Sequence, residues 1–210
     1  MNHIIPTVFA KTQKEFSERF NKLYPISKKI QIDYMDGLFV KSKSPTIPKN
    51  LNLKKFKNEF EAHLMYNRPI THIKKLKAKG FKKIIFHLES KSNTLKTIHE
   101  IKKEKLSCWL ALNPETPVEK LLPYLKSIRG VLLMGVRPGK EHQEFISSVY
   151  RKIKTLRKLS PKTKIQVDGG VNPRVAKRLA DLGVDYINSG SYISDSENPK
   201  DVMQKLNSFF

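Results

Sequence analysis

Residues 83–112 read KIIFHLESKSNTLKTIHEIKKEKLSCWLAL and contain the pattern that decides the fold. Two short apolar runs, Lys83–His87 and Ser107–Leu112, flank a longer segment, Thr94–Glu104, whose apolar residues recur at helical spacing. Runs of the first kind are typical of buried strands, and the second kind is typical of an amphipathic helix. A strand, a helix and a second strand in this order predict that the two strands pair in parallel.

The same unit recurs along the whole chain. Six further runs are strand-like: Ile4–Phe9, Ile30–Tyr34, Phe60–Met65, Gly130–Val136, Lys164–Val167 and Val184–Asn188. The other helix-like segments are Lys11–Tyr24, Pro69–Lys79, Pro117–Lys126, Gln143–Leu159, Pro173–Leu182 and Pro199–Phe210. Eight such units predict one (β/α)8 barrel domain over residues 1–210, although an open doubly wound sheet has the same alternation.

Glycine and proline positions support these helix bounds. Gly80, Gly130 and Gly183 follow three of the segments, where a helix end favours glycine. Pro117, Pro173 and Pro199 stand where a first helical turn accepts proline. Residues 41–57, rich in lysine, proline, serine and asparagine, interrupt the pattern and predict only a short helix around Leu51–Phe56.

Composition limits the class of protein. Hydrophobic residues make up 39% of the 210 residues, which is enough for a folded core. The single cysteine, Cys108, excludes an intramolecular disulfide and a cysteine-based zinc site. No apolar stretch has the length of a membrane span, and the first ten residues lack the basic start of a secretory leader. We therefore expect a soluble, cytoplasmic protein without a membrane partner.

The chain is strongly basic, with 41 lysines and arginines against 19 acidic residues and a formal charge of +22. Such a charge attracts anions, whether phosphorylated metabolites or nucleic acid. The basic residues are spread through every segment, which favours a solvated surface over a dedicated nucleic-acid groove.

Seven motifs occur in order at the predicted strand ends, where barrel enzymes carry their chemistry. They are IDYMDGLFV (32–40), AHLM (62–65), HLE (87–89), LNPETP (112–117), LMGVRPG (133–139), VDGGV (167–171) and SGS (189–191). Together with Pro6-Thr7, this collinear set resembles the ribulose-phosphate 3-epimerase family over nearly the whole chain.

The resemblance implies a proton transfer beside a ketone, interconverting D-ribulose 5-phosphate and D-xylulose 5-phosphate. Inverting a carbon requires a base on one face and an acid on the other. Asp33 and Asp168, from the second and seventh strands, fill these catalytic places in the resemblance. We expect them to face each other across the barrel mouth.

The resemblance also implies a divalent metal ion (zinc, iron, manganese or cobalt). The family's ligand places fall on Gln31, Asp33, His63 and Asp168, and Gln31 replaces a family histidine. A glutamine oxygen binds hard cations but lacks the imidazole's preference for zinc-like ions. The site is therefore expected to bind metal weakly, to favour a harder ion or to lack metal. His87 and Glu89 are expected to be supporting polar groups.

The substrate contacts follow from the same resemblance. Met35, Met65 and Met134 match a methionine lining, and Thr7 and His63 lie beside them. Gly169, Gly170, Gly190 and Ser191 are expected to bind the phosphate through the two last loops. The sixth loop departs from the family, because Lys140-Glu141-His142 replaces glycines, and we expect Lys140 or His142 to supply charge there.

Other readings stay open. One is a non-catalytic barrel that binds nucleic acid through its charge. Another is an epimerase or lyase that acts on a different phosphosugar. A metal-independent decarboxylase is disfavoured, because no lysine occurs within Asp33–Asp36. Barrel proteins of this kind often associate, so a homo-oligomer is a further alternative.

Overall fold

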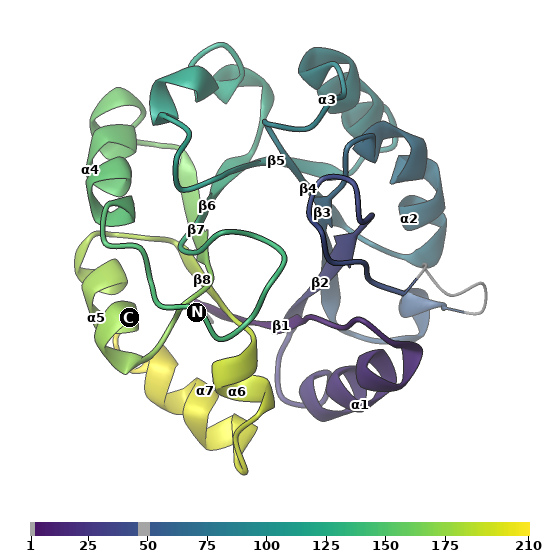
Figure 1. The fold of residues 1–210 in the computed structure, drawn as a ribbon, viewed down its shortest axis with the longest axis vertical. Coiled ribbons are helices and arrows are strands. Elements are labelled where there is room, and N and C mark those ends of the chain that lie inside the picture. The colour runs from purple at the N-terminus through teal and green to yellow at the C-terminus, as the bar shows by residue number, and fades with distance from the viewer. Residues whose placement is uncertain (1–2, 46–50) are drawn as a thin grey trace.

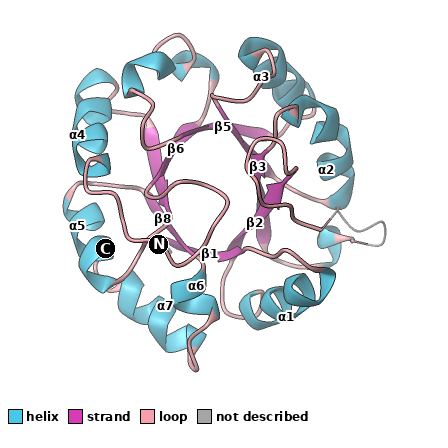
Figure 2. Cartoon of the chain, in the orientation of Figure 1, coloured by secondary structure: helices cyan, strands magenta, loops and turns pink. Residues whose placement is uncertain are grey.

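The computed structural model describes residues 3–45 and 51–210 and shows a closed parallel barrel ringed by helices (Figures 1 and 2). The strands follow chain order around the ring. They are β1 (Ile4–Val8), β2 (Lys29–Met35), β3 (Glu59–Met65), β4 (Lys83–His87), β5 (Ser107–Leu112), β6 (Gly130–Met134), β7 (Lys164–Asp168) and β8 (Tyr186–Ser189). Because β8 pairs with β1, the predicted (β/α)8 barrel is confirmed and the open sheet is wrong.

Helices cover the outside of the barrel. The α-helices are α1 (Gln13–Leu23), α2 (Ile73–Lys79), α3 (Thr94–Lys103), α4 (Val149–Leu159), α5 (Pro173–Asp181), α6 (Ser191–Ser194) and α7 (Pro199–Asn207). Short 3-10 turns are η1 (Leu53–Lys55), η2 (Pro69–His72), η3 (Val118–Leu121) and η4 (Leu125–Ser127). Among the described residues, no helix is long and apolar enough to cross a membrane.

Two predicted helices were wrong in type or extent. The segment Pro117–Lys126 forms the two turns η3 and η4 in place of an α-helix. The segment Gln143–Leu159 becomes helical only at Val149. Its first residues are used in tertiary contacts, since the Ile146 N–H donates to the Gly135 carbonyl and Phe145 packs against Gly135. The short helix α6 was not predicted.

The glycine and proline predictions were correct with two exceptions. Gly80 ends α2 in the left-handed region, and Gly183 follows α5 with φ of +69°. Gly130 instead begins β6, where an added Cβ would lie 2.6 Å from the Trp109 ring, so close packing explains this glycine. Pro117 precedes η3 and lies outside it, whereas Pro173 and Pro199 begin their helices.

The residues 41–57 contain η1, inside the predicted range Leu51–Phe56. Positions 46–50 of this segment lie outside the described residues. The main core lies between the strands and the surrounding helices, with fully buried side chains such as Phe60, Phe81 and Phe86. The barrel interior, by contrast, holds buried polar side chains, among them Gln31, His63 and Gln166. This polar interior positions the site described next.

Candidate active site

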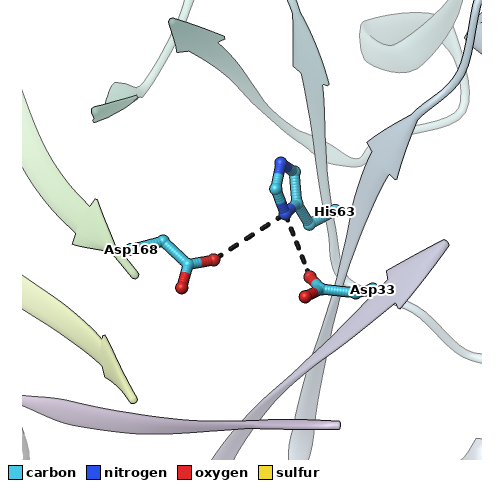
Figure 3. A group of neighbouring side chains, drawn as sticks. All are labelled: Asp33, His63 and Asp168. Atoms are coloured by element: carbon cyan, nitrogen blue, oxygen red, sulfur yellow. Dashed lines mark hydrogen bonds and ion pairs between the residues drawn. The ribbon is translucent and has the colours of Figure 1, made fainter. Parts of the chain in front are cut away.

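Three titratable side chains meet inside one mouth of the barrel. Asp33 on β2 lies in register with His63 on β3, and Asp168 comes from β7 across the ring. Figure 3 shows the three side chains pointing toward one another. His63 Nδ1 lies 3.0 Å from Asp33 Oδ1 and 3.7 Å from Asp168 Oδ2. All three are buried, so their charges act on one another with little screening by water.

Gln31 joins the two carboxylates. Its Nε2 donates to Asp33 Oδ1 at 3.0 Å and to Asp168 Oδ2 at 2.6 Å. Both protons of one fully buried amide are therefore directed at the two aspartates. Gln31, which stands in place of a family histidine, thus directs its NH2 group at the space between Asp33 and Asp168 and keeps its oxygen away from that space.

Neighbouring charges deeper in the barrel fix this orientation. The Lys83 ammonium, which can only donate, lies 2.5 Å from Gln166 Oε1, while the Glu61 carboxylate accepts from Gln166 Nε2 at 2.5 Å. Gln166 Nε2 also donates to Asn188 Oδ1 at 2.5 Å, and it faces Gln31 Oε1 at a longer distance of 3.5 Å. With its oxygen directed at that donor, Gln31 has only its NH2 group to offer the aspartates.

The donor set suits a divalent cation. Asp33, His63 and Asp168 each offer one ligand atom, and these atoms lie within 4.8 Å of one another. Two carboxylates and an imidazole are ligands that divalent transition metals accept. Three of the four expected ligands are thus in place, whereas Gln31 would have to turn its amide to become the fourth.

Burial sets the protonation of this group. Removal from water, followed by the nearby Asp33 charge, raises the pKa of Asp168 to about 7. For His63, burial is the largest single influence and by itself would lower the pKa. The carboxylates of Asp33 and Asp168 together outweigh burial, so the pKa of His63 is raised. Near neutral pH Asp168 can therefore hold or release a proton, as acid–base chemistry requires.

His87 and Glu89 extend the group behind His63. His87 on β4 is fully buried, and its Nε2 lies 2.9 Å from His63 Nε2. Glu89 Oε2 lies 3.5 Å from His87 Nδ1, and Glu89 Oε1 accepts hydrogen bonds from Asn113 N–H and the Thr116 hydroxyl. These two residues contact His63 or each other, and neither is among the residues that line the cavity above the carboxylates.

A cavity of about 880 Å³ opens above the carboxylates. The predicted substrate contacts that line it are Thr7, His63, Met65, Met134, Lys140, His142, Gly169, Gly170, Gly190 and Ser191. Met35 is not among the lining residues: it is fully buried and packs with Phe9 and Met65. Met35 consequently supports the lining from behind.

The sixth loop, between β6 and α4, lies across the barrel mouth (Figure 1). Lys140 is exposed, and the His142 side chain is 71% exposed, with Nε2 lying 3.5 Å from Asp195 Oδ2. The side chain that points inward is Glu141, whose Oε1 lies 3.6 Å from the place of a Cβ on Gly190. Sequence reasoning missed Glu141, since the loss of glycines does not say which of the three residues turns inward.

Comparisons with known proteins agree with this geometry. The model of the ribulose-phosphate 3 epimerase family matches residues 3–194. The ribulose-phosphate 3-epimerase of Schizosaccharomyces pombe is 31% identical over 181 residues, covering 84% of this chain and 79% of that protein. The enzyme of Buchnera aphidicola is 35% identical over 203 residues, covering 90% and 89%.

Solved structures show the same fold at low sequence identity. The tryptophan synthase A-subunit of Pyrococcus furiosus superposes with a TM-score of 0.75 at 14% identity, covering 99% of this chain and 97% of that one. Orotidine 5'-phosphate decarboxylase of Pyrococcus horikoshii gives 0.68 at 15% identity, covering 98% of each chain. These likenesses concern the barrel alone. The family match over nearly the full length, with collinear motifs at the strand ends, makes this chain a member of the ribulose-phosphate 3-epimerase family.

Proposed function

We propose that this protein interconverts D-ribulose 5-phosphate and D-xylulose 5-phosphate, with Asp33 and Asp168 as the acid–base pair at C3. The observation that carries the proposal is the bridging of both carboxylates by one amide, Gln31 Nε2. Two carboxylates from opposite sides of the barrel thereby flank one point at the floor of the cavity. A proton can be removed on one side of a substrate carbon and returned on the other.

The protonation described above suits such a transfer. Because the pKa of Asp168 is raised to about 7, this residue holds a proton near neutral pH and is ready to act as the acid. Asp33 accepts a hydrogen bond from Gln31, lies 3.0 Å from His63 Nδ1 and serves as the base in that direction. In the reverse reaction the two residues exchange roles.

Asp33, His63 and Asp168 would hold a divalent ion of the zinc, iron, manganese or cobalt type. A bound cation supplies positive charge near the oxygens of the enediolate that forms between the two proton transfers. The residues of this chain bind and orient the substrate around the same point. Met65 and Met134 line the cavity, and an apolar lining strengthens electrostatic interactions by excluding water.

The phosphate of the substrate is assigned to the end of the cavity formed by Gly169, Gly170, Gly190 and Ser191. Backbone N–H groups after the last strands of a barrel are a frequent phosphate site. Thr7 lines the same cavity beside Gly190. We further propose that residues 1–210 form one domain that works in the cytoplasm. A homo-oligomer stays an alternative, and the even spread of basic residues disfavours a nucleic-acid partner.

A coupled assay tests the reaction. Protein stripped with a chelator and reloaded with manganese, iron, cobalt or zinc is supplied with D-ribulose 5-phosphate, and D-xylulose 5-phosphate is measured. Asp33→Asn and Asp168→Asn should each lower kcat by about 10² to 10⁴-fold. Asp181→Asn is the matched control, since this carboxylate lies on α5 with its side chain 65% exposed.

Deuterium uptake from heavy water into C3 gives a second readout. The wild type should exchange this position in both epimers, and each asparagine variant should lose the exchange in the epimer whose C3 proton the replaced aspartate removes. Turnover that survives both substitutions would refute the two-aspartate mechanism. If neither the wild type nor Gln31→His turns over D-ribulose 5-phosphate with any of the metals, this substrate is refuted. Another phosphosugar or a binding role is then favoured.

A further inference from the structure

A glutamate that lines the cavity beside Gly190 forms an ion pair with an arginine that lies behind it and is not among the lining residues. Arg19, on α1, places Nη1 2.7 Å from Glu141 Oε1, in the sixth loop. Both side chains are largely buried, with exposed fractions of 21% and 16%. Shielding from water strengthens the attraction between the two charges, but it also removes the hydration of each, so neither charge is left unpaired without a cost. The sixth loop is therefore tied to α1 through this contact.

The Glu141 carboxylate occupies space where an anion is expected. Its Oε1 lies 3.6 Å from the place of a Cβ on Gly190, and atoms of Thr7 lie within 4.0 Å of the same place. Glu141, Gly190 and Ser191 line one continuous cavity with the catalytic carboxylates. A phosphate could not enter this end beside the carboxylate without strong repulsion between two anions.

Arg19 has a second anchor that does not depend on Glu141. The same Nη1 donates to the Phe9 carbonyl at 2.7 Å, while Asp195 Oδ1 lies 3.5 Å from Nη2. These contacts hold the guanidinium in place if the glutamate leaves. An oxygen placed where Glu141 Oε1 now lies would be 2.7 Å from Nη1, a distance typical of a charge-assisted hydrogen bond.

The sixth loop is built in a way that permits such a departure. Its 14 residues from Gly135 to Ser148 contain no helix or strand. The anchors at its base are the bond from Ile146 N–H to the Gly135 carbonyl and the bonds from the Gln143 side chain to the carbonyls of Arg137 and Lys140. Glu141 lies inside the turn that the Gln143 side chain closes on the Lys140 carbonyl, and rotation of the Glu141 side chain alone would take its carboxylate off Arg19 and leave these bonds in place.

We propose that Arg19 is the cation that receives the substrate's phosphate, and that the Glu141 carboxylate occupies its place until the phosphate displaces it. The inference rests on the proposed function, because it assigns the phosphate to this end of the cavity. A dianionic phosphate replaces a monoanionic carboxylate on the same guanidinium, whose planar donors suit phosphate oxygens. Ligands without a phosphate or comparable anion leave Glu141 in place, so the exchange selects for phosphorylated sugars.

Binding of inorganic phosphate tests the exchange directly. Titration calorimetry at 0.15 M salt, in chelator, measures the affinity and the number of sites. Glu141→Gln, which keeps the shape and removes the competing charge, should bind phosphate about tenfold more tightly than the wild type. Arg19→Gln should bind about tenfold more weakly. Both variants should retain one site per chain.

Two matched controls separate this exchange from the general charge of the protein. Glu18→Gln removes one negative charge beside Arg19, from a side chain that is 62% exposed. Arg137→Gln removes one positive charge from the sixth loop, from a side chain that is 75% exposed. Neither control should change phosphate affinity by more than about twofold, because exposed charges are screened at this salt.

Unchanged or weaker phosphate binding in Glu141→Gln would overturn the proposal, as would unchanged binding in a folded Arg19→Gln. If Arg19→Gln fails to fold, Glu141→Gln decides the question alone. Phosphate affinity does not require turnover, so failure here is distinguishable from failure of the epimerase assignment. The expected shifts without epimerase activity would leave the anion exchange standing and refute only the reaction.

Discussion

The Nε2 atoms of His63 and His87 lie 2.9 Å apart in the buried interior of the barrel. A hydrogen bond between two imidazole nitrogens requires that one carries the proton and the other accepts it. Burial lowers the pKa of His87 to about 4, so His87 is neutral and carries a single ring proton. With that proton on Nδ1, which lies 3.5 Å from Glu89 Oε2, the Nε2 of His87 is the acceptor. His63 then directs Nε2–H at His87 and keeps Nδ1 toward Asp33 and Asp168.

Replacing His87 should weaken the metal site although His87 is no ligand. In His87→Phe the Nε2 of His63 loses its acceptor, and the ring is free to turn Nδ1 away from the carboxylates. Loss of such a supporting contact typically lowers metal affinity about 10- to 100-fold. Manganese titration followed by electron paramagnetic resonance measures the change. His99→Phe, at an exposed position on α3, is the control, and equal affinities for both variants would contradict this role.

Gln31→His should strengthen binding of zinc and cobalt. The wild-type amide presents its NH2 group to the aspartates, whereas an imidazole can offer a nitrogen lone pair to a metal. We expect affinity for cobalt to rise at least about tenfold, and the visible absorption of bound cobalt to change with the added nitrogen ligand. Equal cobalt affinity and an unchanged spectrum would mean that the fourth ligand is not what this site lacks.

The raised pKa of Asp168 predicts a pH-dependent stability in metal-free protein. The folded protein holds this proton more tightly than the unfolded chain, because the pKa rises from an ordinary value of 3.8 to about 7. The contribution to stability is therefore fully present below about pH 4 and is lost as the pH rises through 7. Asp168→Asn cannot lose a proton and escapes this loss.

Urea denaturation in chelator at pH 4, 6 and 8 measures the effect. Between pH 4 and pH 8 the free energy of unfolding of the wild type should fall by about 3 kcal/mol relative to that of Asp168→Asn. The exposed control Asp181→Asn should show no such trend. A difference that does not vary with pH would show that Asp168 is not held protonated.

Cys108 should be inert in the folded protein. It is buried on β5, and burial raises the pKa of its thiol to about 12, whereas the thiolate is the reactive form. A disulfide reagent at pH 8 should label the native protein only as fast as the barrel opens, and should label the unfolded chain within seconds. As the single cysteine, Cys108 reports this opening without interference. Rapid labelling of the native protein would contradict its burial.

Local sequence patterns located most elements of the barrel. The predicted bounds of β4 and β5, Lys83–His87 and Ser107–Leu112, agree with the structure, because both strands are short apolar runs bounded by polar residues. Periodicity was misleading at 143–148, where the helical pattern continues but Phe145 packs against Gly135 and Gly170. It was also misleading at 117–126, where 3-10 turns replace the α-helix. A periodic pattern describes which side chains are apolar, and tertiary contacts decide where the helix begins.

The sequence by itself determined the alternation of eight strands with helices, the family resemblance and the two aspartates, because these depend on the order of elements and on residue types at strand ends. That β8 closes on β1 was decided by the structure. Only the tertiary structure decided which atoms face each other. It directed the Gln31 amide nitrogen at both carboxylates through Gln166, and it turned Glu141 inward against Arg19. These contacts join residues more than 100 positions apart. Local periodicity carries no information on such distances, since they depend on how the closed barrel brings its strands and loops together.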